Sequence, residues 1–184
     1  MSEDRPEEKA ELEDRAFWIL ENAEQGEPRD HVYKYRPLFR LWHYTAFTFH
    51  RSWTVFDPLK GSVHDLALIV REVIWDRQHD MQRFRNPLEW LKQGFRAPPT
   101  ISIRDAQLPA SQLVPFLEEL ARISLSVIGL KEAPSIVEGE QFGFQSYQSW
   151  LHVELSWWGD GPDEWTAFTH CVARMREALQ QCFD

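Results

Sequence analysis

The chain has 184 residues, a formal net charge of −9, 43% hydrophobic residues and 27% charged residues. A chain of this length and composition can bury a core of its own, which excludes a mainly disordered protein. We therefore expect one domain over residues 1–184, with residues 1–8 as a flexible acidic tail. The unusual feature is the aromatic content, since nine tryptophans contribute to an aromatic fraction of 14%.

The charge is distributed unevenly along the chain. Residues 1–30 carry a net charge of −7, residues 31–131 carry +5, and residues 132–184 carry −7. This pattern disfavours general nucleic-acid binding, which needs a concentrated positive surface. The ends could instead fold over the basic middle. The N-terminus shows no apolar signal segment and no stretch is long enough to span a membrane, so we expect a cytoplasmic protein.

The predicted elements alternate irregularly between helices and strands. We expect a helix over 7–24, strands over 38–45 and 53–56, a strand over 65–76, a short helix over 86–94, a strand over 100–103, a helix over 113–123, and strands over 141–146 and 151–157. The segment 65–76 also fits helical spacing, but its β-branched residues favour a strand. This order predicts an α+β fold with a mainly antiparallel sheet of about five or six strands.

A closing helix follows a glycine-rich turn near residue 160. We expect Asp160 or Asp163 to act as its N-cap. Its predicted buried stripe consists of Trp165, Phe168, Val172, Met175, Leu179 and Cys182. The two cysteines, Cys171 and Cys182, would lie about 16 Å apart along this helix, too far for a disulfide, so we expect reduced thiols.

The usual catalytic signatures are absent from the sequence. It contains no GxSxG, P-loop, GxGxxG, HExxH or CxxC motif, which favours a non-enzymatic role without a cofactor. The best local pair is His152 and Glu154, which would project about 7 Å apart from one face of a strand. His43 could join them in a metal or acid/base site if the strands are neighbours. A half-exposed polar sheet face explains the same residues.

A second polar group lies at residues 76–80. Asp76, His79 and Asp80 would converge on one side of a helical turn and could hold a metal ion. A capped turn beside Arg77 and Arg83 explains the same pattern and is the favoured interpretation.

The tryptophans fall into two groups. Trp18, Trp90, Trp157 and Trp165 lie on apolar stripes and are predicted core residues. Trp42, Trp75 and Trp158 lie beside polar strand positions, with Arg40 near Trp42 and Arg77 near Trp75. Tryptophan and arginine are common anchors of protein interfaces, so these five residues form a candidate binding set. The alternative is that helices cover both faces of the sheet and bury these rings.

The segment Trp157–Trp165 (WWGDGPDEW) runs from a strand through a glycine turn into the last helix. It resembles the C-terminal pattern of some bacterial domains, a few of which are suspected immunity proteins of polymorphic toxin systems. The resemblance implies a cytoplasmic bacterial protein that neutralises a toxin by binding it, and the acidity of the chain would suit a basic partner. We therefore predict a non-catalytic protein-binding module, with homodimerisation also open. A small-molecule or metal-dependent enzyme with a site on an open sheet face is the alternative.

Overall fold

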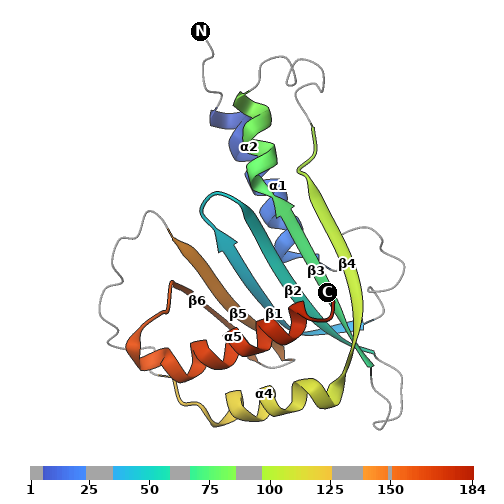
Figure 1. Cartoon of the computed structure of the whole chain (residues 1–184), viewed down its shortest axis with the longest axis vertical. Helices are drawn as coiled ribbons and strands as arrows, with labels where there is room; N and C mark the ends of the chain where they lie inside the picture. The colour runs from blue at the N-terminus through green and yellow to red at the C-terminus, as the bar shows by residue number, and fades with distance from the viewer. Residues whose placement is uncertain (1–5, 24–34, 59–66, 86–96, 126–138, 149–150) are drawn as a thin grey trace.

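A computed structural model describes residues 6–23, 35–58, 67–85, 97–125, 139–148 and 151–184. Its centre is a six-stranded antiparallel sheet in the order β4-β3-β2-β1-β5-β6 (Figure 1). The strands are β1 (Tyr35–Thr45), β2 (Phe49–Pro58), β3 (Ala67–Asp76), β4 (Ile101–Pro109), β5 (Glu140–Gln148) and β6 (Leu151–Trp158). The helices are α1 (Pro6–Glu21), α2 (Arg77–Arg85), α4 (Ala110–Arg122) and α5 (Thr166–Gln180). The predicted α+β class is confirmed.

The ambiguous segment 65–76 is a strand, as predicted. β3 lies between β2 and β4, where both of its faces are covered, and this explains its nearly continuous apolar sequence. The predicted strand at residues 100–103 is longer than expected and runs to Pro109. The helix predicted over 86–94, together with Trp90, lies outside the described residues.

The helices divide between the two faces of the sheet (Figure 1). On one face, here called the α5 face, α4 and α5 pack over the strands. Its core includes Leu41, Trp53 and Val55. On the other face, here called the α1 face, α1 packs on β2 and β3. Because side chains alternate along a strand, consecutive residues of one strand point to opposite faces of the sheet. Residues that are paired across neighbouring strands have their side chains on the same face.

The last helix follows its predicted stripe but not its predicted start. Trp165, Phe168, Val172, Met175 and Leu179 are buried, and Cys182 is partly buried against the same core. The expected cap by Asp160 or Asp163 is wrong: a 3₁₀ turn over Asp163–Trp165 precedes α5, and no side chain caps either element. Asp163 contributes its main-chain oxygen instead, which accepts a hydrogen bond from the Thr166 hydroxyl at 2.7 Å.

The α1 face has a smaller core under α1. Leu12, Ala16 and Leu20 form the buried side of that helix, and Ala23, just beyond its end, is buried with them. Trp18, a predicted core residue, is 49% exposed, so that prediction is wrong. The reason is angular: at 100° per residue, position 18 points away from the stripe set by Ala16 and Leu20.

The C-terminal end of α1 docks on polar side chains from the sheet. Ser52 donates to the main-chain oxygen of Leu20 at 2.8 Å, and Arg71 donates to that of Ala23 at 3.0 Å. Arg71 is completely buried and also makes two hydrogen bonds of 2.8 Å to the carboxylate of Asp105. Main-chain oxygens at a helix end need such donors, and cations there complement the helix dipole.

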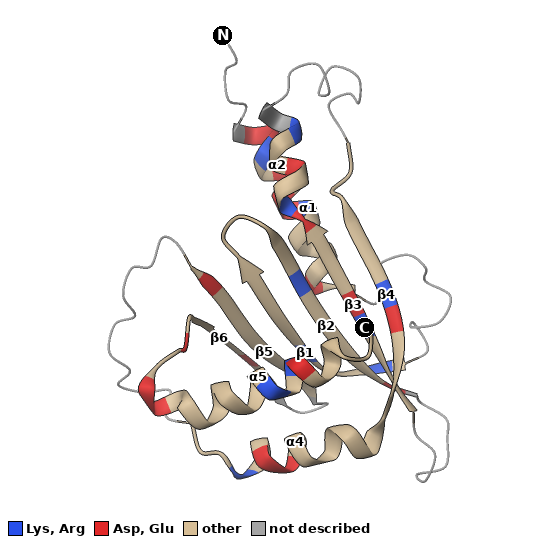
Figure 2. Cartoon of the chain, in the orientation of Figure 1, with Lys and Arg blue, Asp and Glu red and all other residues tan. Residues whose placement is uncertain are grey.

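The possibility that the acidic ends cover the basic middle receives little support from the ion pairs. Glu13 of α1 does pair with Arg77 at 2.7 Å. Arg71 pairs with Asp105 and Arg104 with Glu72, however, and all four belong to the middle segment. Figure 2 shows both signs of charge side by side on β3 and β4.

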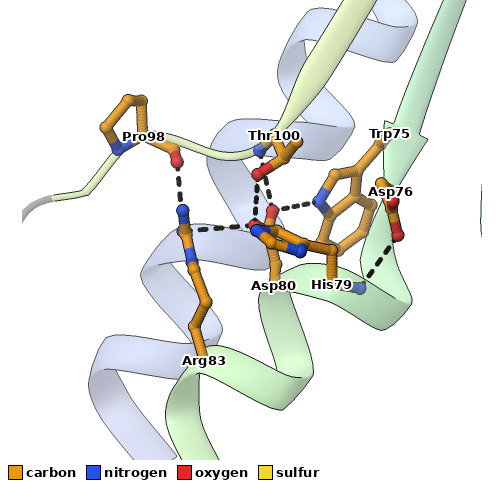
Figure 3. A network of polar contacts seen from close by, with 7 residues as sticks. All are labelled: Trp75, Asp76, His79, Asp80, Arg83, Pro98 and Thr100. Carbon is orange, nitrogen blue, oxygen red and sulfur yellow. Dashed lines mark hydrogen bonds and ion pairs between the residues drawn. The ribbon is translucent and has the colours of Figure 1, made fainter. Parts of the chain in front are cut away.

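A buried carboxylate joins β3, α2 and the start of β4 (Figure 3). The Asp80 carboxylate accepts hydrogen bonds from Trp75 Nε1 at 2.7 Å and from the Thr100 amide and hydroxyl at 2.8 and 2.6 Å. Arg83 completes its surroundings with an ion pair of 3.2 Å. Asp76 accepts the His79 amide at 2.8 Å, so the favoured capped turn is confirmed.

His50 lies in an aromatic enclosure beneath α1. The rings of Phe17, Tyr44 and Trp75 have centroids 5.3, 5.0 and 5.1 Å from its own. Its Nδ1 is buried and has no hydrogen-bond partner among the described residues. Burial, helped by the positive charge of Arg77, lowers the pKa of His50 to about 4. The folded protein therefore holds a neutral imidazole here at pH 7.

Both cysteines are free thiols, as expected. Burial raises the pKa of each, with Glu119 adding to the effect at Cys171. Among the described helices, none has the length and apolar character required to cross a membrane.

Replacing Asp80 with alanine should lower the free energy of unfolding by about 3–5 kcal/mol, because the Arg83 guanidinium, the buried indole N–H of Trp75 and two donors of Thr100 lose their acceptor. Asp76→Ala is the matched control, since it removes one cap hydrogen bond and should cost about 1 kcal/mol. Urea denaturation of both variants measures the difference. Equal losses would contradict a central role for Asp80.

The protein should lose stability as the pH falls from about 6.5 towards 4. In this range the His50 imidazole binds a proton in the unfolded chain but stays neutral in the folded protein, because its folded-state pKa is lowered to about 4. The slope attributable to His50 is at most about 1.4 kcal/mol per pH unit. His50→Phe should flatten the pH dependence in this window. His79→Phe, which alters an exposed histidine of α2, should leave it unchanged. Denaturation curves at several pH values provide the test.

Candidate functional site

Trp42 and Arg40 lie together on the α1 face, but both are buried. The guanidinium carbon of Arg40 stacks 4.7 Å from the centre of the Trp42 ring. The indole lies over Gly143 of β5, where a Cβ atom would overlap its six-membered ring. The predicted stacking exists, and it fills space between β1 and β5 rather than presenting the ring to solvent.

Trp75 and Arg77 are also engaged in contacts within the fold. Trp75 is completely buried, with Phe17 of α1 packed edge-on 5.7 Å away and its indole N–H donated to Asp80. Arg77 donates to the main-chain oxygen of Ala46 at 2.8 Å in addition to its pair with Glu13. The alternative that helices cover these rings therefore holds for Trp75.

Trp158 differs from the other two rings, since it is 40% exposed. It ends β6 on the α1 face, in register with Gln141 and, through Gln141, with Tyr44. Glu154 and Ser156 precede it on the same face and are exposed. We call the α1-face surface of β5 and β6 the β5–β6 surface; its described residues are Gln141, Gly143, Gln145, Tyr147, Glu154, Ser156 and Trp158.

Part of the β5–β6 surface is held by side-chain hydrogen bonds. Gln145 donates to Glu154 at 3.3 Å and accepts the Tyr147 hydroxyl at 2.7 Å. On this same face α1 packs on β2 and β3, which are separated from β5 and β6 by β1 in the sheet. Within the described parts of the chain, no helix packs on the β5–β6 surface (Figure 1).

The three predicted metal ligands do not come together. His43 is in register with Phe142 and Trp157 and belongs to the α5 face, whereas Glu154 is in register with Gln145 and Arg40 and belongs to the α1 face. The sheet itself separates them. His152 is a residue of β6 whose side chain lies outside the described part. No group of three metal-binding side chains occurs among the residues that the structure describes.

His43 instead belongs to an aromatic and charged group on the α5 face. Its ring stacks on Phe142 with centroids 4.5 Å apart, and its Nε2 lies 3.3 Å from the Glu140 carboxylate. The guanidinium carbon of Arg176, from α5, lies 4.9 Å from the centre of the same Phe142 ring. Burial and the charge of Arg176 lower the pKa of His43, against the opposing effect of Glu140.

A cavity of about 160 Å³ opens beside this group, lined by residues of β1, β5, β6 and α5. Phe142, Trp157 and Val172 form its apolar wall, and Arg176 lines one side. Asp160 and His170 also line it and are exposed, so the cavity reaches solvent near them.

The sequence did not single out Phe142 or Arg176. A signal for Arg176 exists, because four residues separate it from Val172 on the buried stripe of α5, which places it about 40° away. An arginine so close to the buried side of a helix is unusual, and this position could have marked Arg176 as a candidate functional residue. Phe142 and Trp157 offered no such signal, since their adjacency depends on the pairing of β5 with β6.

Comparisons with known proteins identify no relative: no family model, no curated protein and no solved structure matches this chain.

Gly143→Ala should lower the free energy of unfolding by about 1–3 kcal/mol or more, because the new methyl group displaces the rigid Trp42 ring. Ser156→Ala, on the neighbouring exposed position of β6, should change it by less than about 0.5 kcal/mol. Thermal denaturation followed by tryptophan fluorescence distinguishes the two. A neutral Gly143→Ala variant would show that Trp42 does not pack as described.

Proposed function

We propose that this chain is a non-catalytic protein-binding module and that its partner contacts the β5–β6 surface. The observation that carries the proposal is the exposure of Trp158 beside Glu154 and Ser156 on a sheet face without a helix over it, within the described residues. Large, half-exposed indoles supply much of the binding energy of protein interfaces.

The composition of the surface supports a protein partner. Tyr147 and Trp158 provide aromatic area, while Gln141 and Ser156 provide hydrogen-bonding groups. Aromatic side chains mixed with small polar ones are typical of surfaces that recognise proteins. Among the described residues of this surface, Glu154 is the one carboxylate and none is Lys or Arg. The chain as a whole has a net charge of −9. These charges favour a partner with a basic contact surface.

The resemblance of the WWGDGPDEW segment to suspected immunity proteins agrees with this proposal, because such proteins act by binding a toxin. Trp158 belongs to that segment and is its most exposed described aromatic residue. The immunity-like role, in a bacterial cytoplasm, is the specific form of the proposal.

Affinity capture from the cells that naturally contain the protein tests the proposal. The wild-type protein should recover a stoichiometric protein partner, and Trp158→Ala should weaken its binding by at least about tenfold, as expected for a loss near 2 kcal/mol. Trp18→Ala is the matched control, since Trp18 is exposed to a similar degree, 49% against 40%, but lies on α1. It should bind like the wild type.

Two results would contradict the proposal. One is repeated failure of the wild-type protein to recover any stoichiometric protein; the other is equal binding by the Trp158→Ala and wild-type proteins. If the recovered partner is a second copy of this chain, sedimentation at two concentrations will show a dimer that Trp158→Ala dissociates, and the surface is then a homodimer interface.

A further inference from the structure

Arg176 is a partly buried cation on α5. It is partly buried against Phe142, and it makes no hydrogen bond or ion pair with any residue that the structure describes. Burial lowers its pKa, with Glu177 and Glu140 opposing this effect. A guanidinium carries five N–H donors, and none of those of Arg176 is taken by an acceptor among the described residues. Arg176 can therefore bind an anionic group that enters the cavity.

Arg174 of the same helix provides a comparison, because it has an ion-pair partner in the fold. It lies two residues earlier, is exposed, and forms hydrogen bonds of 2.5 Å to the Glu119 carboxylate of α4. Arg174 thus links α4 to α5, whereas Arg176 lines the cavity beside Trp157. The two residues differ in their surroundings rather than in their chemistry.

The cavity that Arg176 lines has room for one small ring. Its volume of about 160 Å³ is close to the roughly 150 Å³ of an engineered protein cavity that binds benzene. Phe142, Trp157, Leu41 and Val172 supply an apolar wall. Pockets that bind small molecules combine such a wall with a few polar groups that fix orientation.

The other charges near the cavity leave the region beside Arg176 suited to an anion. Glu140 lies against His43, at 3.3 Å. Asp160 lines the cavity but is exposed, where water and salt screen its charge. His170, also exposed, lines the same opening.

We propose that this cavity binds a small monocarboxylate that carries one apolar ring, with the ring between Phe142, Trp157 and Val172 and the carboxylate on Arg176. The site lies on the α5 face of β5 and β6, opposite the β5–β6 surface. It is independent of the protein-binding role, because its chemistry requires no protein partner.

Titration of the full-length protein with benzoate, followed by NMR of the indole N–H groups, tests the proposal. Benzoate should shift the Trp157 signal saturably, and Arg176→Met should weaken binding by at least about tenfold through loss of the charge-assisted hydrogen bonds. Arg174→Met, the matched control, should bind benzoate as the wild type does. Benzyl alcohol, an uncharged probe of similar size, should bind more weakly and equally to all three proteins.

A second variant keeps the test decisive if Arg176→Met does not fold. Ala173→Leu adds three carbon atoms to the lining of the cavity and should abolish benzoate binding while leaving Arg176 in place. The proposal is overturned if the wild-type protein shows no saturable Trp157 shift with benzoate, or if Arg176→Met and Arg174→Met weaken binding equally. Retention of binding in Ala173→Leu would place the ligand elsewhere and would also overturn it.

Discussion

The buried guanidinium of Arg71 is the interaction on which the α1 side of this fold depends. It lies on β3, binds the Asp105 carboxylate of β4 through two hydrogen bonds, and donates a third to the main-chain oxygen of Ala23, two residues beyond α1. A buried charge is tolerated only when its hydrogen-bonding groups are satisfied, so this residue joins two strands and a helix in one geometry. Ser52 reinforces the same helix end from β2. Together with the packing of Leu12, Ala16 and Leu20, these contacts hold α1 over Trp75 and His50.

The two faces of β5 and β6 differ because α5 covers one of them and, among the described helices, none covers the other. On the α5 face, Phe142 and Trp157 pack towards α5 and border a cavity that Arg176 lines. On the α1 face, α1 packs over β2 and β3, and Glu154, Ser156 and Trp158 are exposed. One pair of strands thus presents a small, partly apolar cavity on one side and an aromatic, acidic surface on the other. The two proposals rest on these separate features, so one can fail without affecting the other.

The burial of the tryptophans shows where the local sequence pattern predicts exposure correctly and where it does not. Trp157 and Trp165 were predicted core residues from their stripes and are buried, whereas Trp18 was predicted with them and is exposed. Trp42 and Trp75, candidates for binding because of polar neighbours, are buried beneath Arg40 and α1. A polar neighbour in sequence does not imply exposure, because a buried arginine can stack on an indole or bind a carboxylate. Of the candidate rings, Trp158 alone remains available at the surface of the described chain.

The sequence by itself determined the α+β class, the strand at β3, the stripe of α5 and the capped turn at Asp76, because these depend on local periodicity and on hydrogen bonds between near neighbours. Only the tertiary structure decided which residues share a face. His43 was a candidate to join His152 and Glu154, but the register of β1 with β5 and β6 places the sheet between His43 and Glu154. The same register brought His43, Phe142 and Trp157 into one row, beside a helix more than a hundred residues away from His43 in the chain. Strand register and helix docking are long-range choices, set by burial of whole faces, and no local pattern contains them.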